Sequence, residues 1–253
     1  MHDFIAFAIV GFLAQIVDGA LGLGFGIISA SVLLAQGVPP AMVSASVNAA
    51  KLPTTGTAAL SHLWHKNLDW NIVVPLCIFG AIGGVIGASA LTSLKGYALQ
   101  VMINLYLLLI GSLIIYRGLR DLAPRLFPKG FTRLIGFSGG LIEGIGGSWG
   151  PIVTTSLLGA GTESRYAIGS SNFSEFAVSV AVFSAFVGAF AIGHWEGGSD
   201  WRSMAIPISG LVIGGLPAAV FGGYLSKITP KRTLTIAVGL LAIGIGIYRF
   251  VTM

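Results

Sequence analysis

Charged side chains are scarce in this sequence, because Asp, Glu, Lys and Arg make up only 9% of its 253 residues. A soluble domain averages about 25% charged residues, so the charges present here cannot cover a water-exposed surface. Hydrophobic residues account for 55% of the chain, and the mean hydropathy is +0.89. The composition excludes an ordinary soluble domain and predicts an integral membrane protein.

Cysteine is almost absent, and so are the groupings that carry catalysis. The single cysteine, Cys77, lies in an apolar run, which excludes a disulfide framework and a metal cluster. No nucleophile-base pair is visible, and the Gly-rich segments lack the Lys-Ser/Thr of a nucleotide-binding loop. The net charge of +5 comes from basic residues in short gaps between apolar runs. This pattern indicates how a chain is oriented in a membrane and does not indicate a nucleic-acid site. We therefore expect no enzyme, cofactor, metal or nucleic-acid partner.

Long apolar runs are what the sequence does contain. About 20 apolar residues cross a bilayer, and regular runs of that order occupy residues 41–64, 70–94, 99–116, 166–192, 203–225 and 234–251. Two further apolar segments, 4–35 and 134–158, are interrupted by glycine clusters at 19–26 and 144–151. Each glycine lowers helix propensity by about 1 kcal/mol and a proline by about 3 kcal/mol. The sequence predicts an all-α, polytopic membrane bundle of about eight hydrophobic segments, two of them broken by glycine.

The two halves of the chain resemble each other. Three matches recur in the same order: Asp18-Gly19 with Glu143-Gly144, Asn48…Lys51 with Asn172…Glu175, and Asp69-Trp70 with Asp200-Trp201. Secondary transporters are often built from such repeats, and their binding site lies where the repeats meet. We predict a first membrane repeat at 1–116, a basic connecting loop at 117–133 and a second membrane repeat at 134–253.

Two membrane topologies are compatible with this repeat. If both irregular segments cross the membrane once, the repeats are parallel, and Lys and Arg divide eight to five between the two sides. If each folds back as a re-entrant hairpin, the repeats are inverted and the division is ten to three, with Lys51 inside the membrane. Because basic residues gather on the cytoplasmic side, the sharper asymmetry favours inverted repeats with a cytoplasmic connecting loop.

Four charged residues fall inside apolar segments: Asp18, Lys51, Glu143 and Glu175. A charge at the centre of a bilayer costs about 3 kcal/mol or more, so such residues usually face a polar interior. The three acids are candidates for proton coupling or for charge pairing. Lys51 has two interpretations, which the sequence leaves open: it binds an anion, or it pairs with an acid and locks two helices together.

The breaks predict where a substrate binds. A broken helix exposes backbone N–H groups at its interior N-terminus, and these groups attract anions. The candidate substrate-binding residues lie at the breaks and on the two helices that carry Lys51 and Glu175: Gly24, Gly26, Asn48, Lys51, Gly147, Ser148, Trp149, Ser170, Ser171 and Asn172.

The same motifs resemble those of the sulfite exporter family (TauE/SafE). The resemblance rests on an acid followed by a glycine-rich break near the start of each half, Asp18-Gly19…Gly26 and Glu143-Gly144…Gly150-Pro151, and it covers nearly the whole chain. It implies a multi-pass carrier of the bacterial inner membrane for sulfur-containing anions such as sulfite, sulfonates, sulfoacetate or thiosulfate.

From the residues and this resemblance together, we expect a secondary carrier that moves a small anion by alternating access. Protons or the membrane potential would couple the transport. An anion channel and a non-catalytic membrane assembly factor are the alternatives. Glycine-rich helix faces permit a homodimer without requiring one.

Overall fold

A computed structural model of the protein describes residues 2–93, 96–119, 130–193, 201–221, 224 and 231–251. All regular secondary structure in these ranges is helical: α1 (His2–Leu21), α2 (Phe25–Ala35), α3 (Pro40–Trp64), α4 (Trp70–Ser93), α5 (Gly96–Leu119), α6 (Phe131–Gly146), α7 (Gly150–Gly159), α8 (Ser164–Ala191), α9 (Trp201–Val220) and α11 (Lys231–Val251). The six regular apolar runs match α3, α4, α5, α8, α9 and α11. Most of the predicted connecting loop, residues 120–129, lies outside the described residues.

The two irregular segments are broken where the glycine clusters predict. The first is interrupted between Leu21 and Phe25, and the second between Gly146 and Gly150. One glycine in each break, Gly22 and Gly147, has a φ of +66°. This left-handed conformation suits glycine, because a Cβ atom would be strained there. The prediction of a break in each segment is confirmed.

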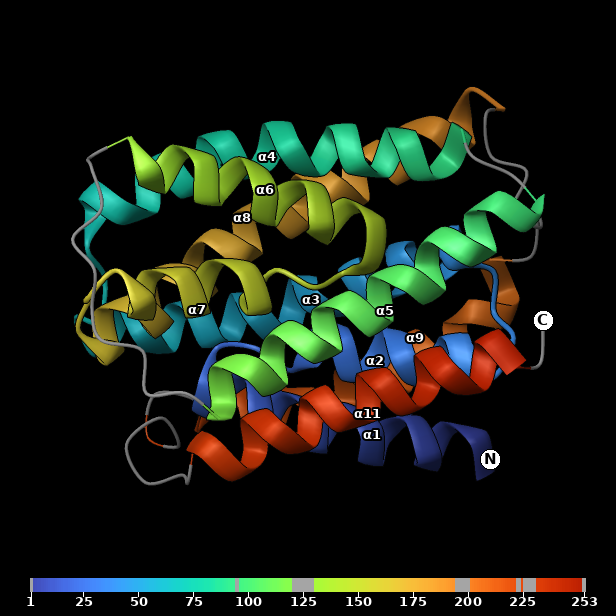
Figure 1. Ribbon diagram of the computed structural model, residues 1–253, viewed down its shortest axis with the longest axis horizontal. Helices are drawn as coiled ribbons and strands as arrows, with labels where there is room; N and C mark the ends of the chain where they lie inside the picture. Colours follow the sequence, from blue (N-terminus) through green and yellow to red (C-terminus); the bar gives the residue numbers. More distant parts are fainter. Residues whose placement is uncertain are drawn as a thin grey trace.

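Each broken segment folds back on itself as a helical hairpin. Helix α1 packs against α2, and α6 packs against α7, where a Cβ atom at Gly139 would touch Val153. In Figure 1, α1 begins and α2 ends at the right of the view, whereas α6 begins and α7 ends at the left. The two hairpins therefore enter the bundle from opposite ends.

The remaining helices surround these hairpins. Helix α1 packs on α9, and α6 packs on α4, while α3 and α8 cross at the centre and α5 packs on α11. Figure 1 shows α5 and α11 lying side by side across the front of the bundle. The buried core draws on every one of these helices, so the molecule has a single continuous interior.

Glycines bring α4 and α6 into backbone contact. A Cβ atom at Gly140 would collide with the Gly80 carbonyl oxygen, and one at Gly144 would collide with the Gly84 carbonyl oxygen. The α1–α9 contact is similar, since a Cβ atom at Gly214 would collide with the Ala8 carbonyl oxygen. Small residues of this kind allow close helix packing in membranes, where the hydrophobic effect does not hold helices together.

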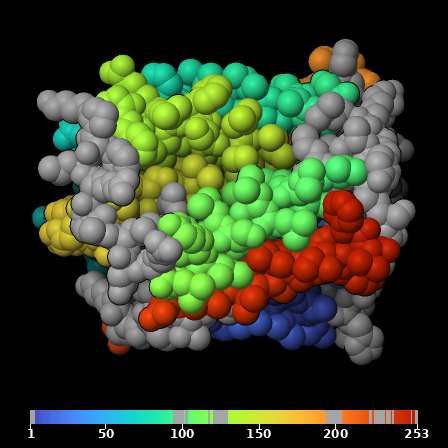
Figure 2. All heavy atoms as spheres, in the orientation of Figure 1, coloured from blue at the N-terminus to red at the C-terminus, as the bar shows by residue number. Residues whose placement is uncertain are grey.

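The outer surface is apolar. Figure 2 shows α5 and α11 across one face of the molecule, and these two helices carry the exposed residues Leu105, Leu109, Leu240 and Ile247. Continuous exposed apolar surface is unusual on a soluble monomer and fits contact with lipid. Among the described residues, three helices are long and apolar enough to cross a membrane: Phe4–Leu21 within α1, Trp70–Ser93 and Ser164–Ala191. The structure is therefore that of a membrane helix bundle.

Candidate functional site

Lys51 lies in the middle of α3 and is completely buried. Its Nζ atom is 2.7 Å from Oε1 of Glu143 and 2.7 Å from Oε1 of Glu175. It also donates a hydrogen bond of 2.8 Å to the carbonyl oxygen of Gly147. An ammonium group has three N–H donors. All three donors of Lys51 are therefore occupied, by groups from α6, from α8 and from the second break.

Both chain breaks meet at this lysine. A Cβ atom at Gly26 would collide with the Gly147 carbonyl oxygen and would lie 2.7 Å from Nζ of Lys51. A Cβ atom at Gly150 would collide with the Gly22 carbonyl oxygen. Only glycine lets the two backbones approach so closely at these positions. The structure thus brings the predicted residues Gly26, Lys51 and Gly147 together.

Asp18 faces the start of α2. Its Oδ1 atom accepts a hydrogen bond of 3.4 Å from the backbone N–H of Phe25, the first residue of α2. A carboxylate at this position interacts favourably with the positive end of the helix dipole. The chain's own carboxylate therefore occupies this interior N-terminus, where the sequence predicts an anionic substrate. Asp18 also lies within electrostatic range of Lys51 and Glu143.

Asn48 and Asn172 occupy matching positions, each three residues before a charged residue of the cluster. Each is buried, and each donates its amide N–H to the carbonyl four residues earlier in its own helix, Ser44 or Ile168. Their Oδ1 atoms have no hydrogen-bond partner in the described part of the chain. Both amides therefore retain an unused acceptor beside the charged cluster.

Trp149 and Ser171 belong to a hydrogen-bonded chain beside the breaks. The Trp149 indole Nε1–H donates to Oγ of Ser171 at 3.1 Å, and Ser171 and Thr154 share a hydrogen bond of 2.7 Å between their hydroxyls. Thr154 in turn donates to the Gly22 carbonyl oxygen at 2.6 Å. Because Trp149 is fully buried, it packs inside the protein in this state and does not line an open chamber.

The two remaining predicted serines, Ser148 and Ser170, form hydrogen bonds with backbone groups and not with Lys51. Ser148 Oγ donates to the Gly146 carbonyl oxygen at 3.2 Å, within its own break. Ser170 Oγ accepts from the backbone N–H of Asp69 at 3.0 Å, at the turn between α3 and α4. In the described part of the chain, neither hydroxyl forms a hydrogen bond with Lys51, Glu143 or Glu175, so their predicted role at the cluster stays a prediction. Gly24 contacts Val17 and Asp18 of the first hairpin.

Three residues of this region are not among those predicted from the sequence. Gln15 is completely buried on α1, and neither atom of its amide has a partner among the described residues. Tyr106 of α5 lies against Gly146, beside the second break. Thr154 connects the breaks. A signal existed for Gln15, because it is a polar residue three positions before Asp18 in an apolar run.

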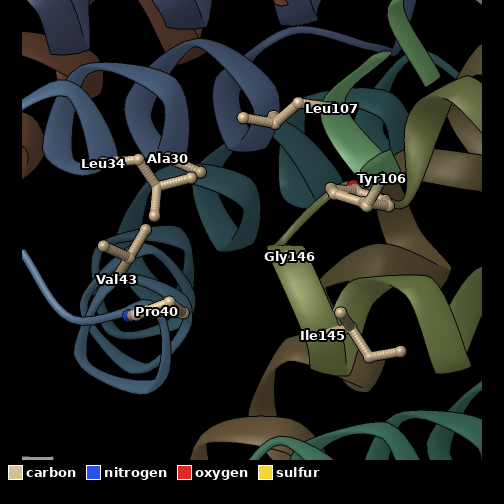
Figure 3. A pocket seen from close by; sticks show the side chains of 8 residues that line it. All are labelled: Ala30, Leu34, Pro40, Val43, Tyr106, Leu107, Ile145 and Gly146. Atoms are coloured by element: carbon tan, nitrogen blue, oxygen red, sulfur yellow. The ribbon is translucent and has the colours of Figure 1, made fainter. Parts of the chain in front are cut away.

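The side chains of Lys51, Glu143 and Glu175 are buried, and a small cavity lies beside the second break. A cavity of about 10 Å³ lies between α2, α3, α5 and α6, lined by the apolar side chains drawn in Figure 3. A cavity of that size holds about one water molecule. Tyr106 and Gly146 form the side of this cavity nearest the second break. The residues described contain no group of His, Cys, Asp and Glu side chains arranged to hold a metal ion.

Comparisons with known proteins give a consistent result. The family model "Sulfite exporter TauE/SafE" matches residues 7–249. The chain is 35% identical over 247 residues to "Probable membrane transporter protein YtnM" of Bacillus subtilis (strain 168), covering 94% of this chain and 80% of that protein. It is 27% identical over 211 residues to "Probable membrane transporter protein ORF9" of Sinorhizobium sp, covering 77% and 73%. No solved structure matches.

The family match spans nearly the whole chain and includes both hairpins and every helix that contacts the charged cluster. The apolar outer surface is that of a membrane protein. The chain belongs to the sulfite exporter TauE/SafE family of membrane transporters.

Proposed function

We propose that this transporter is a secondary carrier that moves a small sulfur-containing anion across the bacterial inner membrane. Sulfite, a sulfonate, sulfoacetate and thiosulfate are the candidate substrates, and the family's name supports sulfite or a related oxyanion. One observation carries the proposal: a fully buried lysine lies where two chain breaks meet. Charged residues inside a membrane mark substrate pathways, and interrupted helices form the substrate sites of many transporters.

An internal duplication would explain why the site lies between the halves. The proposed repeats, 1–116 and 134–253, pair α1 with α6, α3 with α8, α4 with α9 and α5 with α11. Exchanging these partners turns the α4–α6 contact into α9–α1 and the α4–α8 contact into α9–α3, and all four contacts occur. The α3–α8 and α5–α11 contacts map onto themselves. This correspondence supports two repeats related by an approximate two-fold axis.

The hairpins favour an inverted arrangement of these repeats. Since they enter the bundle from opposite ends, the repeats would run in opposite directions through the membrane. Each repeat would then contribute one re-entrant hairpin and three crossings, which makes the protein multi-pass. The excess of Lys and Arg on one side would place the connecting loop, residues 117–133, in the cytoplasm.

Alternating access accounts for the closed interior. A channel in its conducting state needs a continuous path, whereas a carrier passes through a state in which its site is shut from both sides. The cavity of about 10 Å³ is too small for any of the proposed anions. The burial of Lys51 and Glu143 and the small size of this neighbouring cavity support assigning the described conformation to an occluded state of the carrier.

Transport by purified protein in proteoliposomes tests this function. Radiolabelled sulfite, thiosulfate, methanesulfonate and sulfoacetate would be offered separately, with protein-free liposomes as the control. We expect saturable uptake of at least one anion, and faster uptake of the labelled anion when the vesicles are preloaded with the same unlabelled anion. Flux that does not saturate and shows no such exchange would indicate a channel. Absence of flux for all four anions would reject the proposal.

A further inference from the structure

The geometry around Lys51 raises a difficulty for anion binding. Its three N–H donors are taken by Glu143, Glu175 and the Gly147 carbonyl oxygen, at 2.7, 2.7 and 2.8 Å. A passenger anion can therefore reach Lys51 only by replacing one or more of these acceptors.

We propose that the anion takes the place of Glu143 on Lys51, and that Glu143 takes up a proton when it is displaced. This inference rests on the proposed anion transport and specifies how its charge is balanced. One anion and one proton would enter the site together, so the transporter would be a proton–anion symporter in either direction of net flux.

Glu143 is better placed to move than Glu175. It lies in the last turn of α6, four residues before the left-handed Gly147. Glu175 lies inside α8, an uninterrupted helix of 28 residues. A shift of the α6 end would withdraw Glu143 and the Gly147 carbonyl oxygen together. Two of the three Lys51 donors would then be freed at once, and two donors match two oxygens of a sulfite or sulfonate group.

Charge balance explains why the displaced Glu143 takes up a proton. The titratable groups facing Glu143 are Lys51 of α3, Glu175 of α8, Asp18 of α1 and the Tyr106 phenol of α5. Lys51 is the one cation among them, so the displaced carboxylate has no second positive partner in the described site. An uncompensated buried carboxylate is costly, and proton uptake removes that cost.

The proton would bind the Oε2 atom of Glu143. Its Oε2 atom is buried and has no hydrogen-bond partner in the described residues, whereas Oε1 is held by Lys51 and receives a hydrogen bond of 3.4 Å from Ser179. A protonated carboxyl can donate from one oxygen and still accept at the other. Ser179 can therefore keep its contact with Glu143 in the neutral form.

Calorimetric titration of the purified full-length protein with methanesulfonate tests the proposal. Methanesulfonate remains a monoanion over the working pH range, so any proton that appears or disappears belongs to the protein. The binding enthalpy is measured in three buffers of different ionisation enthalpy, and its slope against that enthalpy counts the protons taken up. We expect about one proton per bound anion, because one negative charge enters the buried site.

Matched variants assign this proton. Glu143→Gln should bind methanesulfonate with no proton uptake, because the amide is neutral from the start. Glu175→Gln should still take up about one proton, since Glu143 remains. Glu163→Gln is the surface control: Glu163 is 62% exposed and pairs with Arg165 away from the site, so its count should equal that of the unmodified protein.

The outcomes separate this inference from the proposed function. Binding of methanesulfonate without proton uptake by the unmodified protein would overturn the symport mechanism and leave anion transport standing. Proton uptake that survives in Glu143→Gln and disappears in Glu175→Gln would overturn the assignment to Glu143. Failure of methanesulfonate, thiosulfate, sulfite and sulfoacetate alike to bind would contradict the proposed function itself. The count in the unmodified protein decides the mechanism even if a variant does not fold.

Discussion

Thr154 joins the two chain breaks directly, since its hydroxyl donates a hydrogen bond of 2.6 Å to the carbonyl oxygen of Gly22. Gly22 has a positive φ and begins the first break, and Thr154 lies on α7, directly after the second. The two residues are 132 positions apart in the chain. This bond and the Lys51 cluster hold the hairpin tips together at the centre of the molecule.

Replacing Thr154 with valine should loosen that junction. Thr154→Val keeps the side-chain shape but leaves the Gly22 carbonyl oxygen and the Ser171 hydroxyl without this partner. An unsatisfied buried polar group costs about 1–3 kcal/mol, so we expect a loss of that order in the free energy of unfolding. Denaturant titration in mixed micelles would measure it. Thr57→Val is the control, because Thr57 bonds only the Pro53 carbonyl of its own helix at an exposed position; equal losses in both variants would contradict the interpretation.

Two glycine substitutions should have opposite effects on the stability of the protein. Gly26→Ala places a methyl group against the Gly147 carbonyl oxygen and Lys51 Nζ, and overpacking of this kind costs about 1–3 kcal/mol. Gly188→Ala lies inside α8 with nothing within 4 Å of the new Cβ atom. Alanine there should stabilise the helix by about 0.5–1 kcal/mol. Thermal unfolding of both variants tests the pair, and a Gly26→Ala protein as stable as the parent would refute the close approach of the breaks.

Removing Lys51 should destabilise the protein until its acids are neutralised as well. Lys51→Met leaves Glu143 and Glu175 buried without their cation, which costs about 3–5 kcal/mol. Adding Glu143→Gln and Glu175→Gln to Lys51→Met should recover part of that loss, because Asp18 is then the one carboxylate left among the four charged residues, and it keeps its hydrogen bond from the N–H of Phe25. The free energies of unfolding of the single and triple variants give the comparison. If the triple variant is less stable than Lys51→Met, the destabilisation does not arise from charge.

The surface ion pair provides the control for this series. Arg165 is 2.8 Å from Glu163, and both side chains are more than half exposed. Exposed pairs contribute about 0–1 kcal/mol, so Arg165→Met should change the free energy of unfolding by no more than that.

Cysteine labelling tests the inverted arrangement. In a background with Cys77 replaced by alanine, single cysteines would be placed at Gln36, His65 and Glu163, which are exposed just beyond the ends of α2, α3 and α7. Inverted repeats predict that His65→Cys and Glu163→Cys react with an impermeant reagent from one side of the membrane and Gln36→Cys from the other. Labelling of Gln36→Cys and Glu163→Cys from the same side would instead favour parallel repeats.

The fold was largely predictable because its signal is local. Apolar runs long enough to cross a bilayer locate the helices, and glycine clusters locate the breaks, without any knowledge of distant contacts. The intramembrane position of Lys51, Glu143 and Glu175 also indicates that they are shielded from lipid. Their burial in one cluster agrees with that expectation.

The partners within the site were less predictable because they depend on contacts between distant parts of the chain. Lys51 is separated from Glu143 by 92 residues and from Glu175 by 124, and no local pattern shows that it pairs with both. The sequence predicts a role in proton coupling or charge pairing for Asp18, but no local pattern predicts that its carboxylate accepts the N–H of Phe25. The sequence does not indicate that Thr154 bonds a distant residue, because threonine hydroxyls in helices commonly bond their own backbone.

The backbone contact between α4 and α6 has a consequence for how this sequence can drift during evolution. A larger residue at Gly140 meets the main chain at Gly80, and main chain cannot move aside as a flexible side chain can. Accommodation would require the whole of α4 to withdraw, together with α8, which packs against it. Outward-facing positions on the same helix, such as Ile78 and Ile82, meet no such barrier and can exchange among apolar residues. The packed face and the outer face of α4 therefore tolerate substitution to very different degrees.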